Sequence, residues 1–162
     1  MSGPLQVFFE ADHARLDALL TAARTGHGVE LAHYGELRAG LLRHIGIEEK
    51  ILLPAVRKLR AGQALPLSRQ LRADHAALAA LLVPTPTPEL LGSIAKLLSL
   101  HNALEEGDQG LYAICEEILG ATLAEILERS RSAPPVPLAP HHDGPRAFAA
   151  IERLLRSAGR DP

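Results

Sequence analysis

The chain has 162 residues, enough for one domain with a core of its own, and 47% of them are hydrophobic. The net charge is −2, with acidic and basic residues interspersed, so the basic stripe that nucleic-acid binding requires is missing. Leu and Ala dominate, whereas the chain has no Trp, two Tyr and three Phe, and this composition favours helices over sheets.

The compartment is suggested by the cysteine count and by the absence of targeting signals. Cys115 is the only cysteine, which rules out an intramolecular disulfide and favours a reducing setting. The first residues have neither the basic nor the apolar segment of a signal peptide. No uninterrupted apolar run is long enough to span a bilayer. We therefore expect a cytoplasmic protein that interacts with neither membranes nor nucleic acids.

The first half of the chain predicts two helices. The first begins near Pro4, because proline is favoured in a first turn, and ends at the Gly-His-Gly segment 26–28. The second spans about residues 30–59 and has an apolar face at helical spacing. Pro54 lies inside this second helix and predicts a kink, or the end of its regular part.

The second half predicts two more helices. Apolar residues at helical spacing over 71–82 indicate the third, and the Pro-Thr-Pro-Thr-Pro run 84–88 ends it. The fourth is expected to be long, from about 89 to 129, although Gly107 and Gly110 weaken its middle.

Four amphipathic helices with short connections predict an all-α fold, an antiparallel up-down-up-down four-helix bundle over residues 1–130. The remaining segment, 131–162, is expected to be a Pro-rich extended linker followed by a short amphipathic helix over about 146–157. Because so short a helix is marginal in water, it should pack on its own bundle or form a homodimer with a second copy.

Two segments of the chain repeat one motif. Residues 44–49 and 101–106 both read His-x-x-x-Glu-Glu, and each follows an Asp-His pair, at 12–13 and at 74–75. Positions i and i+4 of a helix lie on the same face, so each motif can offer a His and a Glu to one metal ion. The two hairpins of the bundle are therefore expected to form two halves of one site.

Each predicted helix carries one of these histidines within its apolar stripe. Six buried polar groups in one core are costly without partners, whereas metal coordination would satisfy all of them. The candidate metal ligands are His13, His44, Glu48, His75, His101 and Glu105. Two glutamates could bridge two ions, and a ligand set of nitrogen and oxygen suits iron, with zinc or manganese as alternatives.

Other polar residues near the motifs receive weaker predictions. Four acidic neighbours are expected to face solvent or to support the ligands from outside: Asp12, Glu49, Asp74 and Glu106. Asp108 lies seven residues after His101 and is the preferred supporting residue. Tyr112 is expected to pack in the core rather than to act in redox chemistry.

The segment from His44 to Pro54, His-x-x-x-Glu-Glu followed by aliphatic residues and proline, resembles the hemerythrin or HHE cation-binding family. The resemblance covers about residues 5–129 and implies a four-helix bundle with a non-haem di-iron centre. It implies the same six ligands. Oxygen-carrying members have a second His in the third helix where this chain has Ala79, and an Asp where it has Glu106. The lost His argues against reversible oxygen carriage and leaves a coordination position open, unless another residue fills it.

The resemblance implies a hemerythrin-like protein that binds iron, and through it oxygen or a related small ligand, in sensing or in protection against stress. A di-iron enzyme that reduces peroxide or oxygen is the alternative. A metal-free helical interaction module is the second alternative.

Overall fold

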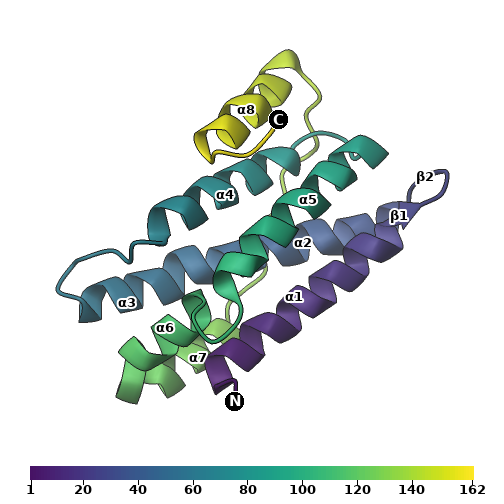
Figure 1. The fold of residues 1–162 in the computed structure, drawn as a ribbon. Coiled ribbons are helices and arrows are strands. Elements are labelled where there is room, and N and C mark those ends of the chain that lie inside the picture. The colour runs from purple at the N-terminus through teal and green to yellow at the C-terminus, as the bar shows by residue number, and fades with distance from the viewer.

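The computed structural model describes residues 1–162 and consists of helices joined by turns, with a long extended linker before the last helix (Figure 1). The first hairpin contains α1 (Pro4–Ala23), the ribbon β1 (Arg24–Thr25) and β2 (Gly28–Val29), α2 (Leu31–Ile47) and α3 (Leu53–Leu59). The second contains α4 (Ser68–Leu81), α5 (Pro88–Glu105), α6 (Leu111–Leu119) and α7 (Leu123–Arg131), and α8 (Pro145–Ser157) completes the chain. The all-α prediction is confirmed, and none of the helices combines the length with the hydrophobicity that a membrane span requires.

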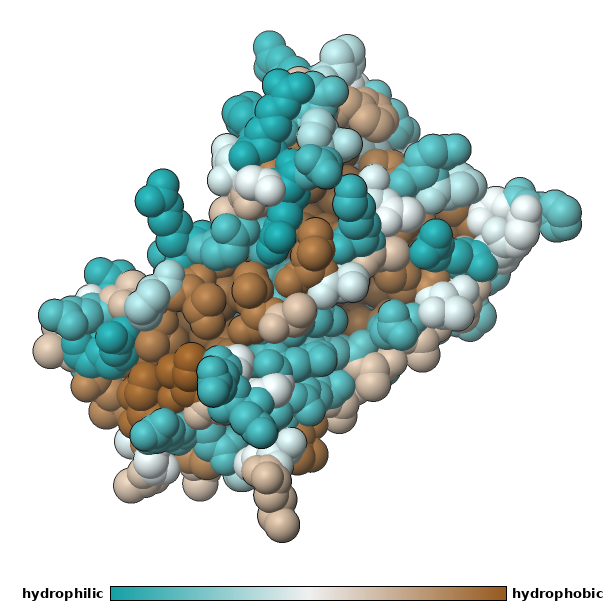
Figure 2. All heavy atoms as spheres, viewed as in Figure 1, coloured by the Kyte–Doolittle hydropathy of each residue, from teal (hydrophilic) through white to brown (hydrophobic).

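The core consists of two hydrophobic clusters. One joins the second half of α1 and the first half of α2 to the end of α4 and the start of α5, and Ile151 and Leu155 of α8 extend it. The other joins the start of α1 to α3, α6 and α7 around Phe9 and Tyr112. On the face shown in Figure 2, apolar side chains gather over the end formed by α3 and α6. The predicted metal ligands lie between the two clusters.

The second predicted helix changes geometry before its proline. Regular α-helix ends at Ile47, and Glu48–Leu52 form a π-helical segment in which the backbone N–H of Leu53 donates to the carbonyl of Glu48. Pro54 has no N–H, and its ring would clash with the carbonyl four residues earlier in a regular α-helix. The wider turn accommodates the proline, and it begins at a predicted metal ligand.

The fourth predicted helix is not continuous, so the expectation of one helix over 89–129 is wrong. It is divided into α5, α6 and α7 by a turn at residues 106–110 and a single 3₁₀ turn, Gly120–Thr122. Gly107 has φ 84°, a left-handed value that glycine adopts without strain. A Cβ at Gly110 would lie 2.2 Å from the carbonyl oxygen of Glu106, so only glycine fits there.

The C-terminal segment wraps around the bundle. The guanidinium groups of Arg38 and Arg43 on α2 donate to the carbonyls of Ala139 and Ala133 in the linker. The predicted terminal helix is present as α8, which packs on α4 of its own chain (Figure 1). The tail thus belongs to the same packed unit as the bundle.

Arg160, just beyond α8, holds a buried carboxylate. Its Nε and Nη2 donate to the two oxygens of Asp74 at 3.0 and 2.9 Å, and Asp74 is 0% exposed. We expect Arg160→Gln to lower the free energy of unfolding by about 1–3 kcal/mol, because a buried charge loses its cation. Arg156→Gln, at an exposed position of α8, is the matched control. Thermal unfolding compares them, and equal losses in the two variants would contradict a specific role for Arg160.

Candidate metal centre

The structure brings all six predicted ligands together in the layer between the two hydrophobic clusters. All are buried, with exposed fractions of 6% or less. They come from five helical segments: His13 from α1, His44 from α2, Glu48 from the start of the π-helical segment, His75 from α4, and His101 and Glu105 from α5. Their ligand atoms form two groups of four that share the two glutamates.

The first group, position 1, is built around the two histidines of the first hairpin. The Nε2 atoms of His13 and His44 lie 3.1 Å apart, as expected for two nitrogens that contact one ion at about 2.0–2.1 Å. Glu48 Oε1 lies 3.4 Å from His44 Nε2, and Glu105 Oε2 lies 3.3 Å from His13 Nε2.

The second group, position 2, repeats this arrangement in the second hairpin. The Nε2 atoms of His75 and His101 also lie 3.1 Å apart. Glu48 Oε2 and Glu105 Oε1 each lie 3.0 Å from one of these nitrogens, those of His75 and His101 respectively. Each glutamate therefore presents one oxygen to each position, which is the geometry of a carboxylate that bridges two ions.

Two histidines are supported by an aspartate of their own hairpin. Asp12 Oδ2 lies 2.8 Å from His44 Nδ1, and Asp74 Oδ2 lies 3.2 Å from His101 Nδ1. When Nδ1 carries the proton and donates a hydrogen bond to the carboxylate, Nε2 keeps a free lone pair that faces the centre. The sequence left open whether these aspartates are exposed or supporting, and the structure makes both of them supporting.

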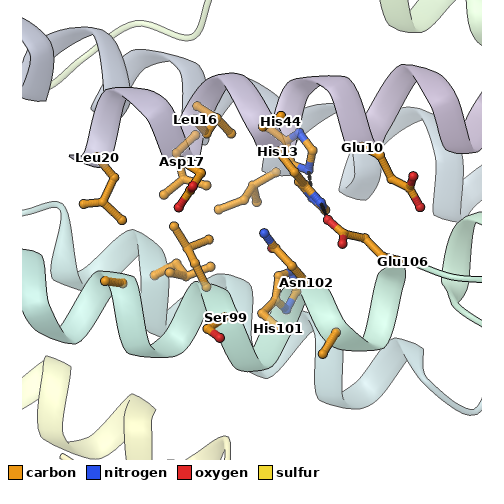
Figure 3. A pocket seen from close by; sticks show the side chains of 17 residues that line it. Glu10, His13, Leu16, Asp17, Leu20, His44, Ser99, His101, Asn102 and Glu106 are labelled. Carbon is orange, nitrogen blue, oxygen red and sulfur yellow. Dashed lines mark hydrogen bonds and ion pairs between the residues drawn. The ribbon is translucent and has the colours of Figure 1, made fainter. Parts of the chain in front are cut away.

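The other two histidines are supported from the opposite hairpin. Glu106 Oε1 lies 2.6 Å from His13 Nδ1 (Figure 3), and Glu49 Oε1 lies 2.7 Å from His75 Nδ1. Both glutamates therefore support histidines from outside the centre, although Glu106 is also exposed to solvent, as predicted. The second Glu of each repeated motif was the available signal, but only the packing of one hairpin on the other shows which histidine it contacts.

Tyr112 reaches the centre with its hydroxyl. The ring stacks on Phe9 with centroids 4.5 Å apart, as expected for a core residue, but its O–H donates to Glu48 Oε1 at 2.5 Å. The hydroxyl also lies 3.0 Å from Glu105 Oε2. In one continuous helix Tyr112 would lie about 10.5 Å from Glu105 along the helix axis. The turn between α5 and α6 instead brings the Tyr112 hydroxyl next to the Glu105 carboxylate. Asp108, the preferred supporting residue, lies exposed in this turn, so that prediction is wrong.

The centre is held together by opposite charges. Burial opposes protonation of His44, but the charge of Glu48 and the hydrogen bond with Asp12 raise its pKa to about 10. Burial likewise opposes protonation of His101, but the hydrogen bond with Asp74 and the charge of Glu105 raise its pKa to about 9. Burial also opposes the charge of Glu48, yet His44 beside it holds the pKa of this carboxyl well below its usual range.

The same atoms have the properties of a cation site. Glu48 Oε2 and Glu105 Oε1 are buried and have no hydrogen-bond donor. Both face position 2, where a divalent ion would neutralise them and would replace the imidazole protons. Four imidazole nitrogens and two carboxylates without a thiolate fit iron, manganese or zinc.

Comparison with known families agrees with this geometry. The family model described as the hemerythrin HHE cation binding domain matches residues 6–129, which include all six residues. No curated protein and no solved structure matches the chain. The match covers most of the chain, and its cation-binding character agrees with the buried His and Glu clusters. The chain therefore belongs to the hemerythrin HHE cation-binding domain family.

Proposed function

We propose that the protein binds two iron ions, one at each position, and that this di-iron centre binds oxygen or a related small ligand. The main support for this proposal is that Glu48 and Glu105 each direct one oxygen toward each pair of histidines. Four carboxylates outside the centre orient the four imidazoles, as the surroundings of bound metals commonly do.

Coordination by the chain is incomplete at position 2. His75, His101 and one oxygen from each glutamate supply four ligand atoms there, and no protein hydroxyl joins them. Iron can accept more than four ligands, so a small molecule could complete its coordination. At position 1 the hydroxyl of Tyr112 already lies among the ligand atoms, in contact with His13 Nε2 and Glu48 Oε1. We therefore propose that the small ligand binds at position 2.

Metal analysis with an optical spectrum tests this proposal. Protein reconstituted with ferrous iron under anaerobic conditions and then desalted should retain about two ions per chain. Exposure to oxygen should produce near-ultraviolet absorption from oxo-bridged ferric ions, whereas zinc-loaded protein should show none. Less than about one ion per chain would contradict the proposal and would favour a metal-free helical interaction module.

A second candidate function, reduction of peroxide, is favoured by Tyr112. Peroxide reduction requires a proton donor beside the metal pair, and the Tyr112 hydroxyl contacts both bridging glutamates. Stopped-flow mixing of ferrous-loaded protein with peroxide separates the two functions. Rapid consumption of at least one peroxide per iron pair would support the enzyme, whereas substoichiometric consumption would exclude it.

We also propose that the protein acts in the cytoplasm, in sensing or in protection against stress. The support for the compartment is the lone Cys115, which is buried and has no disulfide partner. The terminal helix that could have mediated a homodimer buries Ile151 and Leu155 in the core of its own chain. A homodimer through α8 would use its other face, where Phe148 is exposed.

A further inference from the structure

A cavity of about 580 Å³ opens between α1 and α5 and reaches the metal centre. The buried histidines His13, His44 and His101 line it, and Figure 3 shows them between Leu20 on one side and Glu10 and Glu106 on the other. A water molecule occupies about 30 Å³ in the liquid, so oxygen or peroxide would fill only a small part of this space. Cavities of about 300–1,000 Å³ are typical of sites for organic molecules.

The lining of the cavity is divided into an apolar part and a polar part. The apolar part consists of leucines from all four main helices of the bundle: Leu16, Leu20, Leu41, Leu78 and Leu98. The polar part contains the three histidines and Asn102, whose side-chain oxygen is buried without a hydrogen-bond partner. Such an unpaired group costs about 1–3 kcal/mol, and a ligand that donates a hydrogen bond would recover that energy.

The charges around the cavity restrict what can enter. Glu10, Asp17 and Glu106 line it, whereas no lysine or arginine does. The unpaired Asn102 oxygen accepts a hydrogen bond that the hydroxyl of an alcohol can donate and that an ionised carboxylate cannot. An uncharged molecule with an apolar body and one hydroxyl group matches both the apolar part and the polar part of the lining.

We propose that this cavity binds a neutral, elongated organic molecule whose apolar body lies among the leucines and whose hydroxyl faces Asn102 and the metal centre. The orientation toward the metal rests on the proposed metal-binding function, whereas occupation of the apolar part does not. The cavity would then add a second ligand class, an aliphatic or aromatic alcohol, to the small ligands of the centre.

Binding of octanol and of heptyl methyl ether, which has the same length but no hydroxyl donor, tests this proposal. Calorimetry on zinc-loaded protein should show saturable, one-to-one binding of octanol, and the ether should bind at least about tenfold more weakly. Undetectable octanol binding, or equal or tighter binding of the ether, would overturn the proposed ligand class. Zinc content, measured on the same samples, reports separately on the metal proposal. Metal-free protein should still bind octanol, but more weakly, and equal affinity in the two forms would overturn the orientation.

Two phenylalanine variants of α5 test the location. Ala95 lines the cavity and is partly buried, so Ala95→Phe should fill the apolar part and weaken octanol binding at least about tenfold. Leu100 is 44% exposed and lies outside the cavity, so Leu100→Phe should leave the affinity unchanged. Equal weakening in both variants would overturn the location, and so would normal binding by Ala95→Phe. Far-ultraviolet circular dichroism and zinc content establish that both variants fold.

Discussion

Glu48→Ala is expected to abolish tight binding of both ions, whereas His44→Ala should abolish binding of only one. The reason is that Glu48 directs one carboxylate oxygen toward each position, while His44 faces position 1 alone. Loss of a supporting residue outside a metal site costs about 10–100-fold in affinity, and loss of a shared ligand should exceed this.

Metal analysis after desalting measures the difference, with Glu117→Ala as the matched control. Glu117 is an exposed glutamate on α6, so that variant should retain the full metal content. A full metal content in Glu48→Ala would show that the ligand assignment is wrong. Equal loss in Glu48→Ala and His44→Ala would instead contradict a bridging role for Glu48. Circular dichroism should confirm that the three variants remain helical.

The stability of the metal-free protein should fall as the pH rises above about 6.5, and metal should reverse this trend. In the metal-free fold the pKa values of His44 and His101 are raised from 6.5 to about 10 and about 9. The protonated imidazoles therefore stabilise the fold fully below pH 6.5, and this contribution is lost as the pH rises to 9–10. Between these pH values, one such group lowers the free energy of unfolding by on the order of 1 kcal/mol per pH unit.

The lowered pKa of Glu48 acts in the opposite direction at low pH. The stability that the ionised Glu48 contributes is fully present when the pH is above 4.5, the ordinary pKa of this group, and is lost as the pH falls below that value. Metal-free protein should therefore be most stable between about pH 4.5 and 6.5.

Metal binding requires neutral imidazoles, so its affinity and the stability that it adds should increase with pH. Melting temperatures of metal-free and zinc-loaded protein from pH 5 to 9 should therefore diverge. Parallel curves would contradict the idea that imidazole protons and metal ions compete for the same atoms.

The sequence predicted the helices and the convergence of the six buried residues because regular helical spacing determines which side chains share a face. Regular helix runs from His44 up to Ile47, so Glu48, the next residue, still lies on the face of His44, and His101 and Glu105 share a face within α5. Each of these pairs lies where local periodicity is reliable.

The residues whose contacts the sequence did not predict lie where the regular helical periodicity ends. Glu49 follows the start of the π-helical segment, Glu106 follows the end of α5, and Tyr112 comes after the turn. At these positions the direction of each side chain depends on the geometry of the turn and on packing between the hairpins. Neither can be deduced from the spacing of residues along the sequence. The second glutamates and Tyr112 could be placed only with the fold in hand.

Cooperative unfolding requires that the parts of a core be energetically connected. The two hydrophobic clusters of this protein meet across a layer of charged and polar side chains rather than across apolar contacts. Without ions, mutual ion pairs connect them, and such pairs weaken when either partner changes its protonation. With ions, coordinate bonds from both hairpins would join the clusters into one unit. Metal removal should therefore broaden the unfolding transition as well as lower its midpoint, so that the protein would lose two-state behaviour before it loses its helices.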